Sequence, residues 1–350
     1  MLLPNKYGQS TVQYVTEVGT MEPLTDSYGR RIKSLRVSIT DRCNFRCRYC
    51  MPAEGLPWLP RADVLTYEEI AHIAGVMTSI GIDSIRLTGG EPLVRRDVPT
   101  LIRLLRSLPG LRSLSLTTNG TMLSKLAGPL AEAGLTRINV SLDSLIAHKF
   151  FQITRRDALA SVLAGLEALE AYPSIHPIKV NAVAMRDFSE EEVLDFAALA
   201  RRKPYVIRWI EFMPLDADQI WTKDDILTGA AIRTIIENHY GPLVRITDGD
   251  ASETARRYRF ADGVGEVGFI NPVSEPFCES CDRIRLTAEG GLRTCLFSQH
   301  ETDLRGILRS GGSDDDLVAA IRAAVNAKEL KHYIGDKRFI RTKSMSQIGG

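Results

Sequence analysis

From residue 35 onward, short runs of apolar and β-branched residues alternate with longer stretches of amphipathic character. The short runs are typical of buried strands, and the longer stretches are typical of helices that cover a sheet. Strands are predicted at Leu35–Thr40, Ser84–Thr88, Ser113–Thr118, Arg137–Leu142, Ile178–Ala184 and Val206–Phe212. Helices are predicted near residues 66–80, 97–108, 122–133, 155–170 and 189–201.

Two of these helices carry N-terminal signals. Thr66 is followed three residues later by Glu69, which predicts a capping box. Ser189 precedes three glutamates at 190–192, which predicts a cap with acidic groups at the positive end of the helix dipole. Because six strands alternate with five helices, we expect an α/β fold with a parallel sheet and right-handed crossovers.

Polar motifs follow five of the six predicted strands. They are the cysteine-containing loop, Thr88-Gly89-Gly90-Glu91-Pro92, Thr117-Thr118-Asn119-Gly120, Ser141-Leu142-Asp143 and Glu211-Phe212-Met213-Pro214. Parallel β/α folds place their active sites at the carboxyl edge of the sheet, so these motifs predict one shared site. A doubly wound sheet with ordinary turn residues at this edge is the alternative.

The pattern changes after about residue 221, and we place a boundary near residue 220. Residues 1–20 show no periodicity and are expected to form a flexible extension. Residues 21–220 carry the repeats. Residues 221–350 form a C-terminal region with helices near 224–239 and 314–327 and strands near Arg256–Phe260 and Glu266–Ile270.

Composition and charge restrict the class of protein. The 350 residues are 44% hydrophobic and 25% charged, with a net charge of +1, which is ordinary for a globular protein and does not favour nucleic-acid or membrane binding. No apolar run approaches a membrane span, and the first residues lack the apolar core of a signal peptide. All six cysteines fall into two groups of three, which favours metal sites in a reducing, cytoplasmic compartment over disulfides.

The first cysteine group is Cys43, Cys47 and Cys50, with the spacing C-x3-C-x2-C. A loop this short can wrap three thiolates around one metal centre. A four-iron cluster would keep one iron without a protein ligand, open to a substrate or cofactor. A zinc ion would need a fourth, distant ligand to close its tetrahedral site. Three incidental buried cysteines are the third interpretation.

The second cysteine group is Cys278-x2-Cys281-x13-Cys295, followed by His300. Taken alone, this spacing fits a Cys3His zinc site. Arg283 is two residues from Arg285, so both would point to one face of a strand.

Several polar residues lie where strands should face the shared site. They are Arg36, Arg86, Thr117 and Lys179. Charges enclosed by a fold are costly unless paired, and phosphate oxygens would pair with guanidinium groups. Solvated strand ends or internal salt bridges would explain them equally well. Gly89-Gly90 would let the backbone approach a ligand closely, although the motif also fits a plain turn.

Here the chain resembles a known family. The C-x3-C-x2-C loop with Tyr49 before its last cysteine resembles the signature of radical S-adenosylmethionine (SAM) enzymes. The lead-in Leu35-Arg36-Val37-Ser38-Ile39-Thr40-Asp41-Arg42, the second cysteine group and the terminal Gly349-Gly350 resemble the GTP 3′,8-cyclases, from about Met21 to the end. The resemblance implies an incomplete six-stranded (βα)6 barrel over residues 21–220, with residues 221–350 as an α+β extension covering its open side.

The resemblance also implies a reaction. SAM binds the open iron and is cleaved by an electron from the reduced cluster to methionine and a 5′-deoxyadenosyl radical. The radical takes a hydrogen atom from C3′ of GTP, and C3′ then attacks C8. One electron and one proton complete 3′,8-cyclo-7,8-dihydro-GTP, in the first step of molybdenum cofactor biosynthesis.

Residue roles are implied in the same way. Two [4Fe–4S] clusters are held, one by Cys43, Cys47 and Cys50 and the other by Cys278, Cys281 and Cys295, whose open iron receives the guanine end of GTP. SAM contacts fall to Tyr49, Gly90, Ser141 and Met213. GTP contacts fall to Arg36, Arg86, Thr117, Lys179, Arg283, Ile284 and Arg285. The tail with Gly349 and Gly350 inserts into the active site, and nothing in the family makes His300 a ligand.

The family further implies an electron donor, a homodimer and transient delivery of the product to the next enzyme, cyclic pyranopterin monophosphate synthase. One rival is another radical SAM enzyme with an auxiliary cluster, such as a peptide-modifying maturase. The terminal Gly-Gly and the arginines at 36, 283 and 285 disfavour it. A second rival is an iron–sulfur or zinc protein that carries electrons or binds nucleic acid, which the near-neutral charge and the open ligand positions disfavour.

Overall fold

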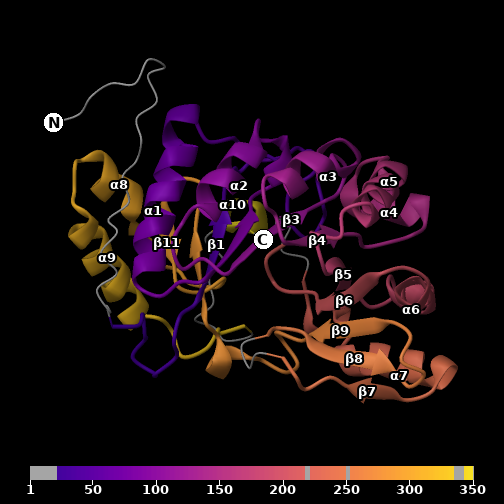
Figure 1. Ribbon diagram of the computed structural model, residues 1–350. Coiled ribbons are helices and arrows are strands. Elements are labelled where there is room, and N and C mark those ends of the chain that lie inside the picture. The colour runs from indigo at the N-terminus through magenta and orange to yellow at the C-terminus, as the bar shows by residue number, and fades with distance from the viewer. Residues whose placement is uncertain (1–21, 217–220, 250–252, 335–342, 350) are drawn as a thin grey trace.

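A computed structural model describes residues 22–216, 221–249, 253–334 and 343–349. The predicted extension at residues 1–20 lies outside these ranges. The described chain contains one mixed sheet of twelve strands in the order β12-β11-β10-β1-β2-β3-β4-β5-β6-β9-β8-β7, with helices packed along it (Figure 1). The α/β class expected from the alternating pattern is therefore confirmed.

The six predicted strands form the centre of the sheet, in sequence order and parallel to one another. They are β1 (Ser34–Ser38), β2 (Ser84–Thr88), β3 (Ser113–Thr118), β4 (Arg137–Ser141), β5 (Ile178–Ala184) and β6 (Tyr205–Glu211). Each observed bound lies within two residues of the predicted one. Their apolar side chains, including Leu35, Ile85 and Leu114, are buried against the helices, which is why these strands read as apolar runs.

The helices that connect these strands also lie close to their predicted positions. They are α1 (Tyr67–Ser79), α2 (Val98–Arg106), α3 (Leu123–Glu132), α5 (Leu159–Glu170) and α6 (Val193–Arg202). The capping box at Thr66 and Glu69 is confirmed, with both reciprocal bonds present. The predicted cap at Ser189 is wrong, because its hydroxyl accepts the Met185 amide and the first turn is a 3-10 turn. The short helix α4 (Ala147–Thr154) was not predicted, since it begins without a side-chain cap.

The C-terminal region extends the sheet at both edges. Strand β10 (Arg283–Leu286) pairs in parallel with β1, and β9 (Glu266–Ile270) pairs in parallel with β6. Outside them lie β11 (Gly291–Arg293) and β12 (Thr302–Asp303) on one side, and β8 (Arg256–Phe260) and β7 (Leu243–Arg245) on the other. Residues far apart in sequence thus border the same central strands.

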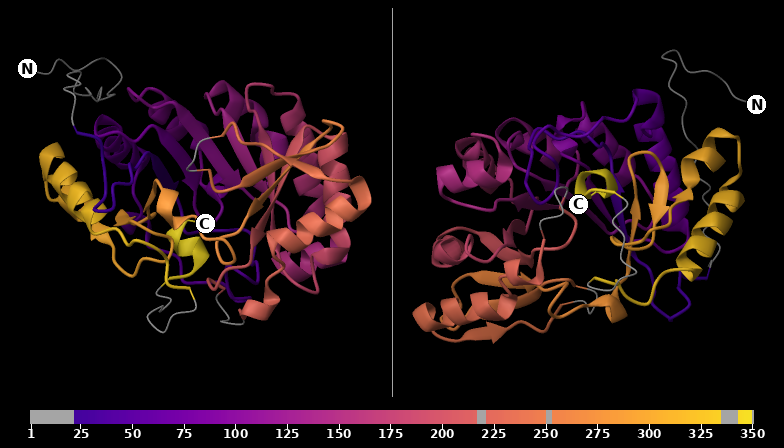
Figure 2. Two further views of the ribbon diagram at one scale, coloured as in Figure 1. Left: turned by 90° about the horizontal axis from the view of Figure 1, so that it is seen from below. Right: turned by 180° about the vertical axis from the view of Figure 1, so that it is seen from behind.

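Helices α8 (Leu304–Arg309) and α9 (Asp314–Asn326) of the C-terminal region sit at the opposite end of the molecule from α7 (Gly229–Tyr240) (Figure 1). Helices α8 and α9 lie beside α1, while α7 lies beside α6 (Figure 2). Side-chain contacts join the first group to α1: the His72 ring is hydrogen-bonded to Asp314 at 2.7 Å, and Arg309 forms an ion pair with Glu69 at 2.6 Å. Within the described ranges, no helix has the length and apolar character needed to cross a membrane.

Candidate active site

The loop after β1 carries the first cysteine group. Cys43, Cys47 and Cys50 are half-buried free thiols that line one pocket. Burial raises the pKa of Cys43 to about 12 and that of Cys50 to about 11, so without a metal these thiols stay protonated. The backbone amide of Phe45 donates a hydrogen bond to the Cys43 sulfur at 3.4 Å. Three sulfurs that border one pocket, one of them accepting an amide, have the donor chemistry of an iron–sulfur site, although the described residues bring no three metal-ligating side chains close enough to hold a single metal ion.

The turn after β2 is packed against the start of this loop. The Gly90 amide donates to the Thr40 carbonyl at 2.7 Å, and a Cβ on Gly90 would lie 2.6 Å from the Asp41 carbonyl oxygen. The glycine therefore allows the close approach of two backbone segments. The buried Glu91 carboxylate accepts bonds from Thr118 Oγ1 at 2.7 Å and the Asn119 amide at 2.6 Å, which ties the ends of β2 and β3 together.

The four residues predicted to contact SAM all line this pocket. They are Tyr49, Gly90, Ser141 and Met213. Asp143, which sequence reasoning did not select, fixes one of them: its carboxylate accepts the Tyr49 hydroxyl at 2.7 Å and the Val183 amide at 2.9 Å. Burial raises the pKa of Asp143 to about 6. The only sequence signal was a carboxylate directly after a predicted strand.

A row of three arginines crosses the sheet on the pocket side. Arg36 on β1 is in register with Arg86 on β2 and with Arg285 on β10, so their side chains are neighbours on one face. Among the described residues, no carboxylate lies within ion-pair distance of Arg36 or Arg86. Burial first, and then neighbouring arginines, lower the pKa of Arg36 and of Arg86 to about 9. The row is a concentrated positive site suited to a polyanion.

A second basic group lies further along the sheet. Arg208 on β6 is 5% exposed and lines the same pocket, where its guanidinium donates to Asn181 Oδ1 at 2.9 Å and to Asn139 Oδ1 at 2.8 Å. Sequence reasoning missed Arg208. A charged residue between Ile207 and Trp209, inside a predicted buried strand, was the signal that could have found it.

The remaining residues predicted to contact GTP are placed differently from one another. Thr117 and Arg283 line the pocket. Lys179 is outside the pocket lining, but it is two residues before Asn181 on β5 and so shares a face with this pocket-lining residue. Burial first, and then Arg208, lower the pKa of Lys179 to about 7. The Ile284 side chain is 1% exposed and belongs to the hydrophobic core, so only its backbone can take part.

The second cysteine group borders the same pocket. Cys278 and Cys281 occupy a turn before β10, where the Cys281 amide donates to the Cys278 carbonyl at 3.1 Å, and Cys295 follows β11. The Phe297 amide donates to the Cys295 sulfur at 3.5 Å. Like the first group, these three cysteines are free thiols that line the pocket. His300 is exposed and lies outside the pocket lining.

The C-terminal tail enters the pocket as a short helix, α10 (Met345–Ile348), whose Met345 and Ser346 line it. The Gly349 carbonyl accepts a hydrogen bond from Arg285. A Cβ on Gly349 would lie 2.7 Å from Thr88 Oγ1, so this position requires glycine. Gly350 lies outside the described residues.

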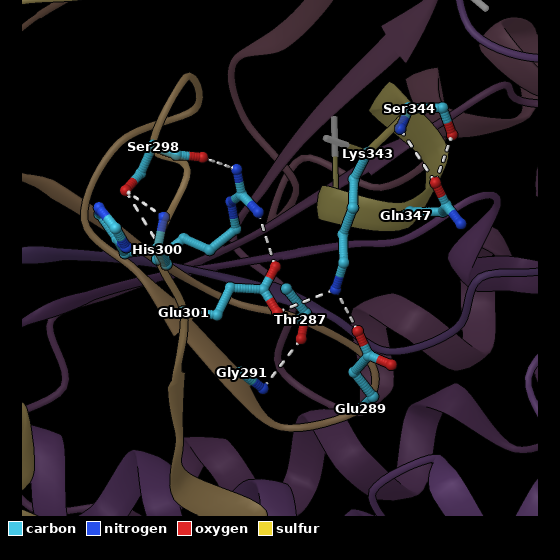
Figure 3. A network of polar contacts seen from close by, with 10 residues as sticks. Thr287, Glu289, Gly291, Ser298, His300, Glu301, Lys343, Ser344 and Gln347 are labelled. Atoms are coloured by element: carbon cyan, nitrogen blue, oxygen red, sulfur yellow. Dashed lines mark hydrogen bonds and ion pairs between the residues drawn. The ribbon is translucent and has the colours of Figure 1, made fainter. Parts of the chain in front are cut away.

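A polar network holds the start of this tail (Figure 3). The Lys343 ammonium bonds to Glu289 and, at 2.8 Å, to Glu301. Glu301 in turn accepts from Arg293 at 2.6 Å, and Arg293 donates to the Ser298 carbonyl in the segment after Cys295. The tail is thus joined to the hairpin of the second cysteine group.

Two family models match the chain. Residues 37–200 match the Radical SAM superfamily, and residues 205–334 match Molybdenum Cofactor Synthesis C. The GTP 3′,8-cyclase of Syntrophomonas wolfei subsp. wolfei is 44% identical over 331 residues, which covers 93% of this chain and 100% of the relative. The GTP 3′,8-cyclase of Moorella thermoacetica is 45% identical over 327 residues, with 93% and 100% covered. Human molybdenum cofactor biosynthesis protein 1 is 43% identical over 310 residues, 88% of this chain and 48% of the human protein.

Among solved structures, SuiB of Streptococcus suis bound to S-adenosylmethionine has a similar fold. The TM-score is 0.58 at 15% identity, with 94% of this chain and 76% of that chain covered. An identity this low shows the fold alone. The sequence matches go further: because two GTP 3′,8-cyclases align over their full length at 44% and 45% identity, the chain belongs to the GTP 3′,8-cyclase family.

Proposed function

We propose that this protein cyclises GTP to (8S)-3′,8-cyclo-7,8-dihydroguanosine 5′-triphosphate by radical SAM chemistry, the first step of molybdenum cofactor biosynthesis. One observation carries the proposal: a single pocket is lined by both cysteine triads and by the arginine row of β10, β1 and β2. A site of this kind can accept a redox cofactor at each end and a triphosphate between them.

The first triad, Cys43, Cys47 and Cys50, would hold the [4Fe–4S] cluster to which SAM would bind. When bound, this cluster supplies the electron that cleaves SAM to methionine and a 5′-deoxyadenosyl radical. The chain positions SAM through Tyr49, whose hydroxyl Asp143 holds at 2.7 Å, and through the backbone at Gly90. Ser141 and Met213 complete the SAM side of the pocket.

The arginine row receives the triphosphate of GTP. Arg36 and Arg86 are buried beside like charges, so an incoming polyanion removes an electrostatic penalty that already exists in the free protein. The contact with GTP is extended by Thr117, Lys179, Arg283 and the backbone at Ile284. The second triad, Cys278, Cys281 and Cys295, would hold a second [4Fe–4S] cluster, which would bind the guanine end of GTP at its open iron.

The tail closes the site. The bond between Arg285 and the Gly349 carbonyl holds the tail against a residue of the arginine row. A closed pocket excludes water from a reactive radical, which would otherwise react with solvent. We therefore assign Gly349 and Gly350 to positioning the substrate during hydrogen abstraction.

The same proposal includes the architecture and the partners. Strands β1–β6 with their helices form an incomplete barrel over residues 21–220, and residues 221–350 cover its open side. The parallel pairing of β9 and β10 with its two edges supports this arrangement. The enzyme acts as a homodimer in the cytoplasm, takes its electrons from a separate donor and passes its product to cyclic pyranopterin monophosphate synthase.

The deciding experiment is anaerobic reconstitution followed by incubation with SAM, a reductant and GTP. We expect two four-iron clusters per chain, no stoichiometric zinc, 5′-deoxyadenosine and cyclised GTP. One cluster with one zinc ion, the latter lost on His300→Ala, would favour a zinc site at the second triad. SAM cleavage without cyclised GTP under any reductant would contradict the proposed reaction.

A further inference from the structure

A buried lysine lies behind the second cysteine triad. Lys328 follows α9 and is 2% exposed. Its ammonium donates to the Arg283 carbonyl at 3.1 Å and to the Thr294 carbonyl. Arg283 is two residues beyond Cys281, and Thr294 directly precedes Cys295. One side chain therefore joins the two segments that carry these cysteines.

The position of Lys328 is matched by a second buried cation, Arg30, which donates to the Cys278 carbonyl at 2.9 Å. The two differ in charge compensation. Arg30 is paired with the buried carboxylate of Asp26 at 2.5 Å. Lys328 has no carboxylate within ion-pair distance among the residues that the structure describes, and the adjacent Glu329 carboxylate accepts the Thr294 hydroxyl instead.

An ammonium buried without a counter-charge is expensive, and two carbonyl oxygens offset only part of the cost. The two carbonyl bonds place the Lys328 ammonium between the segments that carry Cys281 and Cys295. Thiolates of a cluster bound by these cysteines would therefore lie close to the ammonium and could act as its counter-charge.

We propose that Lys328 is a positioning residue of the second triad, whose ammonium joins the segments carrying Cys281 and Cys295 and supplies the counter-charge for an anionic cluster held by them. The inference rests on the proposed function, in that the second triad holds a cluster. It follows that Lys328 lowers the free energy of unfolding of the cluster-free protein. When the cluster is bound, its negative charge removes this destabilisation. A cation at this place also raises the reduction potential of that cluster, because it favours the more negative, reduced state.

The test uses the full chain with three substitutions. Lys328→Met removes the charge and keeps an unbranched side chain of similar length, and Lys328→Arg keeps the charge. Lys125→Met is the matched control, because Lys125 is exposed on α3. Each protein is melted without clusters and after anaerobic reconstitution, its iron and zinc are counted, and its clusters are titrated by electron paramagnetic resonance at defined potentials.

Without clusters, Lys328→Met should melt at or above the melting temperature of the unsubstituted protein. Its melting temperature should then rise less on reconstitution than that of the unsubstituted protein. At a fixed potential, the ratio of reduced to oxidised second cluster should fall about tenfold, a shift of about 59 mV for one electron. Lys328→Arg and Lys125→Met should behave like the unsubstituted protein.

Two outcomes would overturn the inference. The first is that Lys328→Met changes neither the reduction potential of the second cluster nor the rise in melting temperature on reconstitution. This result would show that the lysine charge does not interact with the cluster. Failure of Lys328→Met to fold without clusters would show that the carbonyl bonds alone account for the lysine. These readouts use neither GTP nor SAM cleavage, and the metal count separately reports zinc in place of iron, so an error in the proposed function would be recognised as such.

Discussion

Replacing Arg36 by methionine tests the arginine row at its centre. The substitution removes the guanidinium between Arg86 and Arg285 and retains an unbranched side chain. Two effects of opposite sign should follow. GTP should bind about ten- to a hundredfold more weakly, because one charge-assisted hydrogen bond contributes about 1.5–3 kcal/mol. The ligand-free protein should become more stable, because a buried charge that lies beside like charges has been removed.

The size of the second effect follows from the pKa of Arg36. A fall from 12.5 to about 9 corresponds, at about 1.36 kcal/mol per pH unit, to an upper limit of roughly 5 kcal/mol against the charged guanidinium. Even a third of this free energy would raise the melting temperature by a few degrees. The penalty is present while Arg36 is charged and is relieved as pH rises above about 9. The difference in melting temperature between Arg36→Met and the unsubstituted protein should therefore become smaller at alkaline pH.

The assay combines equilibrium dialysis of GTP against reconstituted protein with thermal melts of ligand-free protein from about pH 7 to pH 10. Arg112→Met is the control, since Arg112 is exposed just before β3 and outside the pocket lining. It should change neither quantity. Unchanged GTP affinity together with a lower melting temperature for Arg36→Met would refute the reasoning, because Arg36 would then be a stabilising structural residue and no part of an anion site.

The remaining predictions concern the two triads, the tail and Lys179. Cys47→Ala should abolish SAM cleavage, whereas Cys281→Ala should keep part of it and lose cyclised GTP; equal losses in product analysis would contradict this division. Deleting Gly349 and Gly350 should preserve iron content and GTP binding but lower cyclisation by about a hundredfold, and a normal rate would identify the tail as an ordinary frayed end. Burial, then Arg208, hold the pKa of Lys179 at about 7, and triphosphate should raise it, so GTP binding at about pH 8 should take up a proton. Calorimetry in buffers of different ionisation enthalpy measures that uptake, and its absence would place Lys179 away from the phosphates.

Much of the central architecture was predictable because it is encoded locally. Buried parallel strands leave continuous apolar runs, and the capping box at Thr66 repeats a known local pattern. Polar residues that follow those strands indicated the carboxyl edge of the parallel sheet, where the pocket lies. The cysteine spacings predicted that each triad borders a site for the same reason, and the structure places both triads on one pocket; the two metal centres stay a prediction.

The rest depends on pairing between distant segments, which no local pattern records. The alignment of Arg36 with Arg86 and Arg285 is set by the register of three strands, one of them about 250 residues away. Asp143 and Arg208 became site residues only when their partners, Tyr49 and Asn181, were placed in space. The cap predicted at Ser189 failed because a preceding turn competes for its hydroxyl.

The pairing of the C-terminal strands with both edges of the central sheet has a consequence for biosynthesis of the chain. Strand β1 is finished at Ser38, but β10 begins at Arg283, so the ribosome adds roughly 240 residues before that edge can be paired. At about 5–20 residues per second, the nascent chain exposes an unpaired strand edge for tens of seconds. Open edges of this kind recruit other strands and lead to aggregation. Interrupted translation before β9 would leave both edges unprotected, so premature termination should yield insoluble fragments rather than a smaller working domain.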